Sequence, residues 1–150
     1  MGNDGLRRRA LDLLARREHS VRELRDKLSS KLAGDADAIE AVLEALVAEG
    51  LLSDRRFAED FIRAHRERGQ GPLRITAELR QRGVADALVD ELLDIGDAAW
   101  QAVARGARRK RFGDALPAAF AERARQARFL RGRGFTEEQV RRALGDDDLS

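Results

Sequence analysis

The side chains best suited to chemistry in this 150-residue chain are arginines gathered toward its C-terminal end. Between Trp100 and Phe135 ten side chains are basic and two, Asp114 and Glu122, are acidic, so this segment carries a local excess of eight positive charges. A guanidinium group presents a planar fork of donors that fits phosphate and carboxylate oxygens. The segment is therefore predicted to bind a polyanion through non-specific phosphate contacts. The predicted binding residues are Arg105, Arg108, Arg109, Lys110, Arg111, Arg125, Arg128, Arg131 and Arg133.

The remaining reactive side chains form no catalytic pattern. Cysteine is absent, which excludes disulfides and thiolate metal sites, and the sequence shows no Ser-His-Asp set and no glycine-rich phosphate loop. His19 and His65 are far apart in the sequence and have no metal-ligating residues grouped with them. We therefore predict that the protein is not an enzyme and uses no metal or cofactor.

Helices must position the basic residues, because apolar residues recur at intervals of three and four along almost the whole chain and no segment alternates with period two. The predicted fold class is all-α, with about nine helices. In the helix expected to begin at Asp97, Trp100 and Ala104 lie on the apolar face, and Trp100 is predicted to pack in the core rather than stack on a base. The side chains expected to project from the other face, free to bind, are Arg105, Arg108 and Arg109.

A six-residue phrase occurs twice, as Leu79-Arg-Gln-Arg-Gly-Val84 and as Leu130-Arg-Gly-Arg-Gly-Phe135. Each copy is predicted to end an arginine-bearing helix with a glycine in the left-handed conformation. With a weaker copy near Gly34, the pattern predicts an elongated tandem array of three-helix repeats, two repeats being the alternative to three. The predicted domains are residues 1–53, 54–96 and 97–150, the last with an acidic tail at 146–148.

Several helix boundaries are predicted from capping patterns. Ser20-Val-Arg-Glu23 and Thr136-Glu-Glu-Gln139 both match the capping box, in which a hydroxyl and a side chain three residues later satisfy each other's backbone N–H groups. Asp54 is predicted to be the N-cap of the fourth helix, and the eighth helix is predicted to begin near Asp114.

The segment between Gly50 and Gly83 carries a more specific pattern. It combines Gly50-Leu, the acidic Asp54, the pair Phe57-Ala58, Gly71 and the turn Leu79-Arg-Gln-Arg-Gly-Val84. This combination resembles the central repeat of the RecX family of regulatory proteins. The resemblance extends outward, because residues 20–24 look like the first repeat of that family and residues 131–136 look like the third, so that it covers residues 10–144.

The resemblance implies a function that the periodicity alone does not. Members of this family are built from tandem three-helix repeats, bind in the groove of the RecA filament assembled on DNA, and restrain RecA in DNA repair and the SOS response. The restrained activities are ATP hydrolysis, strand exchange and the coprotease function. The expected partners are the RecA filament and single- or double-stranded DNA, and the basic segment is expected to meet DNA phosphates or an acidic surface of RecA.

Two other interpretations remain open in the sequence. Residues 10–53 also resemble a winged-helix transcription regulator, in which Arg22, Arg25, Lys27 and Lys31 would face DNA. A wing, however, requires two strands after the third helix, and the segment that starts at Asp54 has helical periodicity. A scaffold that binds only protein would differ by lacking salt-sensitive contacts with DNA.

The composition predicts where the protein works. No apolar run approaches the length of a membrane span, and the N-terminus lacks the apolar region of a signal peptide. Together with the absence of cysteine, these features predict a soluble, cytoplasmic protein. A monomer is expected, while the sequence itself leaves the oligomeric state open.

Overall fold

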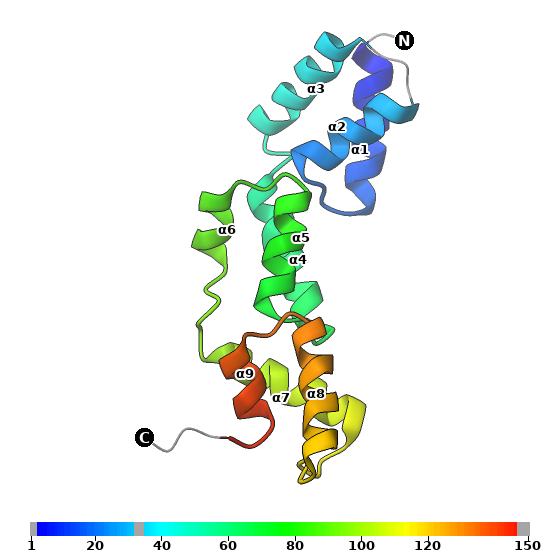
Figure 1. Cartoon of the computed structure of the whole chain (residues 1–150). Coiled ribbons are helices and arrows are strands. Elements are labelled where there is room, and N and C mark those ends of the chain that lie inside the picture. Colours follow the sequence, from blue (N-terminus) through cyan, green and yellow to red (C-terminus); the bar gives the residue numbers. More distant parts are fainter. Residues whose placement is uncertain (1–2, 32–34, 147–150) are drawn as a thin grey trace. The chain divides into compact units, whose positions relative to one another are not determined.

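The computed structural model describes residues 3–31 and 35–146 of the chain, and these residues form nine α-helices and no strand (Figure 1). The all-α prediction is therefore confirmed for the described part of the chain. The weak repeat copy at Gly34 and the tail beyond Asp146 lie outside the described residues. The helices are α1 (Asn3–Arg16), α2 (Val21–Lys31), α3 (Ala36–Ala48), α4 (Asp54–Glu67), α5 (Pro72–Gln81), α6 (Asp86–Leu92), α7 (Ala99–Phe112), α8 (Phe120–Gly132) and α9 (Glu137–Ala143).

The chain divides into two compact units. Unit 1 contains residues 1–60 and 79–89, and unit 2 contains residues 61–78 and 90–150, so that α4, α5 and α6 each contribute to both. No helix in the described ranges is long and apolar enough to cross a membrane.

The core of unit 1 lies among α1, α2 and α3, which pack against one another. Because residues three and four apart share a helix face, each of these helices buries one stripe of aliphatic side chains. The buried members of this core are Leu6, Ala10, Leu13, Leu24, Leu28, Ile39, Val42, Leu43, Leu46 and Leu52.

The start of α2 is fixed by two different carboxylates. The predicted capping box is present, since the Ser20 backbone N–H donates to Glu23 Oε1 at 3.1 Å and the Glu23 backbone N–H donates to Ser20 Oγ at 3.0 Å. Asp54 was predicted to cap its own helix, and this is wrong: its Oδ1 accepts from the Val21 backbone N–H at 2.8 Å, while Ser53 Oγ accepts from the Arg56 backbone N–H of α4. The serine one residue earlier performs that capping, which leaves the Asp54 carboxylate for α2.

The two copies of the six-residue phrase form the same turn. Gly83 and Gly134 have φ values of 86° and 97°, and the apolar residue after each glycine donates its N–H to the carbonyl five residues earlier, Val84 to Leu79 and Phe135 to Leu130. This is the hydrogen-bond pattern of a Schellman C-cap, which requires the left-handed conformation that glycine adopts without strain. The prediction for both glycines is confirmed.

Each of these turns also docks on the beginning of another helix in its own unit. In unit 1 the Arg82 carbonyl accepts from Ser20 Oγ at 2.7 Å, at the start of α2. In unit 2 the Arg133 carbonyl accepts from the Gly71 N–H at 2.7 Å, at the start of α5. Arg82 and Arg133 occupy the same place in the repeated phrase, so the sequence repeat corresponds to a repeated docking contact.

The core of unit 2 contains α7, α8 and α9, which pack against one another (Figure 1). Its buried side chains include Ala104, Leu130, Phe135 and Val140. The second predicted capping box is present at the start of α9, where the side chains of Thr136 and Gln139 accept from each other's backbone N–H groups.

The prediction that the eighth helix begins near Asp114 is wrong, because α8 begins at Phe120. Pro117 lies in the intervening segment, and the residue before a proline is biased away from helical conformation. The guanidinium of Arg108 also donates to the carbonyls of Asp114 and Ala115 at 3.2 and 3.1 Å, so these carbonyls are satisfied without a helix.

Candidate nucleic-acid interface

Several basic residues of α7 lie on the two flanks of its buried stripe. Trp100 and Ala104 are buried, and Trp100 Nε1 donates to the Asp94 carbonyl at 2.9 Å, which confirms the prediction that this tryptophan packs in the core. At 100° per residue, Arg105 and Arg109 fall on one flank of this stripe and Lys110 on the other. Each flank contributes to a separate hollow in unit 2.

The larger hollow is a groove of about 430 Å³, which we call the cationic groove. Three segments of unit 2 line it: the end of α4 with the residues that follow, one flank of α7, and the end of α8. Besides its two cations, α7 lines the groove with small side chains and Val103, so a ligand backbone could approach this helix closely. Those residues are Ala102, Val103, Gly106 and Ala107.

The rim of the cationic groove carries five basic side chains and one acidic side chain, Glu67. Such an excess of one charge in a concave site concentrates counter-ions of the opposite sign. Within the described ranges, none of these five cations forms an ion pair with a carboxylate. They are Arg66, Arg68, Lys110, Arg111 and Arg133.

Aromatic rings hold several of these guanidinium groups. The Arg66 guanidinium carbon lies 5.3 Å from the centroid of the Trp100 ring, and that of Arg133 lies 5.1 Å from the Phe129 ring. A cation over an aromatic face is attracted by the ring quadrupole. Each of these two guanidinium groups is therefore attracted to an aromatic ring, and neither has a carboxylate partner in the part of the chain that the structure describes.

One predicted binding residue is not on the surface. Arg108 was expected to project freely from α7, and this is wrong: its side chain is buried, with a relative exposure of 2%. Arg108 follows Ala104 by four residues, so it continues the buried stripe of the helix. Its guanidinium donates hydrogen bonds to the carbonyls of Asp114 and Ala115 and to Gln126 Oε1, the last at 3.5 Å.

Two further predicted residues are engaged by neighbouring acids. Arg131 forms a bidentate pair with Glu137 at 2.6 and 3.0 Å, which raises the pKa of Arg131 and lowers the pKa of Glu137. Arg125 pairs with Glu122 at 3.2 Å, and Glu122 has its pKa lowered by hydrogen bonding to Gln126 and by the charge of Arg125. Both pairs are exposed, where such pairs contribute little to stability and exchange readily.

The remaining predicted residues lie in different places. Arg105 and Arg109 line a smaller hollow of about 270 Å³ with Arg142 and Asp114, on the other flank of α7. Arg128 is exposed on α8. The structure thus brings Lys110, Arg111 and Arg133 together in the cationic groove and leaves Arg105, Arg109 and Arg128 outside it.

Sequence reasoning missed Arg66 and Arg68 as parts of this surface. They lie well before α7 in the chain, at the end of α4 and in the connection to α5. Gly69 brings this stretch close to α7, since a Cβ added there would lie 3.3 Å from Ala107 Cβ. A glycine followed by Gln-Gly-Pro was the available signal for a tight approach.

The fold and the site define a class of protein: an all-helical chain of three-helix modules that displays a cationic groove. Models of the three RecX domains match this chain, the first three-helix domain at residues 7–46, the second at 53–93 and the third at 99–144. The chain therefore belongs to the RecX family of regulatory proteins.

Individual relatives agree with this assignment. The regulatory protein RecX of Halorhodospira halophila is 52% identical over 146 residues, which is 97% of this chain and 90% of that protein. The RecX protein of Pseudomonas fluorescens is 43% identical over 144 residues, 96% of this chain and 92% of its own length. The crystal structure of RecX from Lactobacillus salivarius has the same fold, with a TM-score of 0.79 at 19% identity over 99% of this chain and 97% of that chain.

Proposed function

We propose that this protein binds the RecA filament assembled on DNA and restrains its activities, namely ATP hydrolysis, strand exchange and the coprotease function. It would act in DNA repair and the SOS response as a cytoplasmic monomer without catalysis of its own. Membership of a family of regulatory proteins supports this role. The alternative of a winged-helix regulator loses its main support, because α4 occupies the segment where a wing would have to begin.

The observation that carries the proposal is the cationic groove of unit 2. Five cations without carboxylate partners in the described ranges surround a surface of small residues, an arrangement that suits the phosphates of a nucleic acid strand or an acidic protein surface. If the groove neutralises about four phosphates, the logarithm of the binding constant for DNA should fall with the logarithm of salt concentration, with a slope of about −3 to −4.

The proposal assigns different weights to the predicted binding residues. Lys110, Arg111 and Arg133 make the principal contacts, joined by Arg66 and Arg68, because they rim one groove. Arg105, Arg109 and Arg128 contribute long-range attraction from outside the groove. Arg125 and Arg131 contribute after exchanging their carboxylate partners for phosphate, and Arg108 supports the α7–α8 connection.

The test follows ATP turnover by RecA on single-stranded DNA as the protein is added. We expect a substoichiometric loss of rate. The double variant Lys110→Glu/Arg111→Glu should require more protein for the same loss of rate. When its binding to single-stranded DNA is measured over a series of salt concentrations, the slope of log K against log salt concentration should be shallower by about 0.7 for each phosphate that the variant no longer neutralises.

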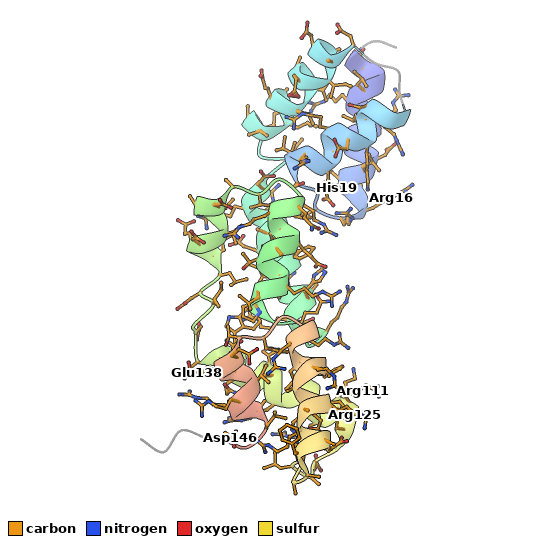
Figure 2. The ribbon with its side chains drawn as sticks, viewed as in Figure 1. Arg16, His19, Arg111, Arg125, Glu138 and Asp146 are labelled. Carbon is orange, nitrogen blue, oxygen red and sulfur yellow. The ribbon has the colours of Figure 1, made fainter. Side chains whose placement is uncertain are left out.

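A matched control reverses two exposed arginines of α1 in unit 1, Arg8→Glu/Arg16→Glu, which changes the net charge by the same amount in residues that do not line the groove (Figure 2). This control should inhibit nearly as well as the unmodified protein. An unmodified protein without effect on ATP turnover, strand exchange and filament length would refute the regulatory role. Equal losses in both double variants would refute the role of the groove.

A further inference from the structure

Two phenylalanines meet where α7 and α8 end, and one of them, Phe129, lines the cationic groove. Phe112 is the last residue of α7 and Phe129 lies in the last turns of α8, and their rings form an edge-to-face pair with centroids 5.3 Å apart and planes at 87°. Both side chains are only partly buried. Edge-to-face geometry holds two rings in a defined orientation, because the positive edge of one ring meets the negative face of the other.

Three arginines surround this pair. The guanidinium carbon of Arg111 lies 5.5 Å from the Phe112 centroid and 5.9 Å from the Phe129 centroid, that of Arg125 lies 5.2 Å from Phe112, and that of Arg133 lies 5.1 Å from Phe129. Figure 2 shows Arg111 and Arg125 on the same side of unit 2. The three cations come from two helices and the residue that follows one of them, and they share one aromatic support.

We propose that Phe112 and Phe129 are positioning residues, which hold the guanidinium groups of Arg111, Arg125 and Arg133 for the phosphates of a nucleic acid strand. The inference rests on the proposed function, since it concerns the same groove. A free arginine side chain loses rotamer freedom when it binds, at a cost that pre-ordering reduces. A ring that already restrains the guanidinium removes part of that cost without adding any charge.

Direct stacking of bases on these rings is the less favoured role. The ring faces are already approached by guanidinium groups, so a base would first have to displace a cation that favours binding. An exposed aromatic surface available for stacking lies elsewhere on α8, at Phe120, whose relative exposure is 86%. Phe120 therefore provides a matched control that separates the two roles.

The test measures binding of a fluorescently labelled oligodeoxythymidylate by anisotropy over a series of salt concentrations. Phe129→Leu and Phe112→Leu each keep an apolar side chain and every charge, so we expect affinity to fall about two- to fivefold with an unchanged salt slope. Phe129→Tyr retains the aromatic face and should bind as the unmodified protein does. Arg133→Gln should lower the magnitude of the slope by about 0.7, because one phosphate fewer is neutralised.

Each result decides between roles. Unchanged affinity in both leucine variants would overturn the inference, and so would a loss in Phe129→Tyr equal to that in Phe129→Leu, which would indicate packing alone. A loss on Phe120→Leu that matches the loss on Phe129→Leu would assign base stacking instead. If the unmodified protein shows no salt-dependent binding, the nucleic-acid part of the proposed function fails, an outcome distinct from normal binding that is insensitive to Phe112 and Phe129.

Discussion

The docking of the repeated turn in unit 2 predicts an unusually high cost for Gly134→Ala. A Cβ at this position would lie 2.4 Å from Arg74 Cβ and 2.6 Å from Arg74 N, at the start of α5. Neither atom can rotate away, because one is backbone and the other is fixed to it. The turn would have to move away from α5, which would break the hydrogen bonds from the Gly71 N–H and the Leu73 N–H, at 2.7 and 2.9 Å.

The magnitude follows from two contributions. Forcing an L side chain into the left-handed region, at the φ of 97° found here, costs about 1–2 kcal/mol. Each of the two broken hydrogen bonds contributes about 0.5–1.5 kcal/mol. The free energy of unfolding should therefore fall by about 2–5 kcal/mol in Gly134→Ala.

Two other glycines separate these contributions. Gly50 has a φ of 75° and open space around its added Cβ, so Gly50→Ala should show the backbone strain alone, about 1–2 kcal/mol. An added Cβ at Gly71, which is not in the left-handed region, would lie 2.5 Å from the Gly134 carbonyl group. Gly71→Ala should therefore show the cost of disrupting the docked turn without that strain, about 1–3 kcal/mol.

Urea unfolding provides the measurement. Far-UV circular dichroism follows the helices of the whole chain, and the fluorescence of Trp100, the single tryptophan, follows unit 2. Gly134→Ala and Gly71→Ala should lower the midpoint of the fluorescence transition. The reasoning is refuted if Gly134→Ala costs no more than Gly50→Ala, because the close approach would then carry no energy.

Two further predictions concern buried polar side chains. Arg108→Met should lower the free energy of unfolding by about 2–4 kcal/mol, because it leaves the loop carbonyls near Pro117 without donors. As a control, Arg109→Met replaces an exposed arginine and should change the free energy of unfolding by less than about 0.5 kcal/mol. Equal effects of the two substitutions in urea unfolding would contradict the burial of Arg108. Burial lowers the pKa of His19, whose Nε2 lies 2.9 Å from Lys27 Nζ, so the folded state binds this proton less readily than the unfolded chain. The contribution of His19 to stability is complete above the pKa of histidine in the unfolded chain, about 6.5, and is lost as the pH falls below that value. Urea unfolding at several pH values should reveal this dependence, and His19→Gln should weaken it.

The sequence predicted the local structure where the signal is local. The capping boxes at Ser20 and Thr136 and the glycine turns at Gly83 and Gly134 depend on residues close together in the chain, and all four are present. The docking of these turns was not predictable, because the Arg133 carbonyl meets Gly71, which lies several helices earlier in the chain. Nothing in the repeated phrase itself indicates which helix start accepts it.

Two of the wrong predictions have a common cause. Asp54 and Arg108 were both assigned from the geometry of a single helix, and both side chains bind elements outside that helix: Asp54 the start of α2, and Arg108 the loop before α8. A helical projection gives the direction of a side chain but not the groups it meets. For Arg108 the spacing itself was a signal, since it follows Trp100 and Ala104 at intervals of four and so continues the buried stripe.

The arrangement of helix ends explains how the cationic groove can hold so many like charges. Arg66 lies in the last turn of α4, Lys110 and Arg111 in that of α7, and Arg133 directly after α8. The partial negative charge at a helix C-terminus stabilises nearby cations, by about 0.3–1 kcal/mol each when exposed. This stabilisation offsets part of the mutual repulsion that five adjacent cations would otherwise suffer.

The same arrangement restricts how an anion can bind. A phosphate at a helix N-terminus is held by backbone N–H groups, but the C-terminal ends that converge here present carbonyl oxygens, which repel it. Binding must then depend on side chains that extend beyond the helix ends, with no contribution from the backbone. Their orientation becomes decisive, which is why neutral substitutions at Phe112 and Phe129 should affect affinity at a site otherwise defined by charge.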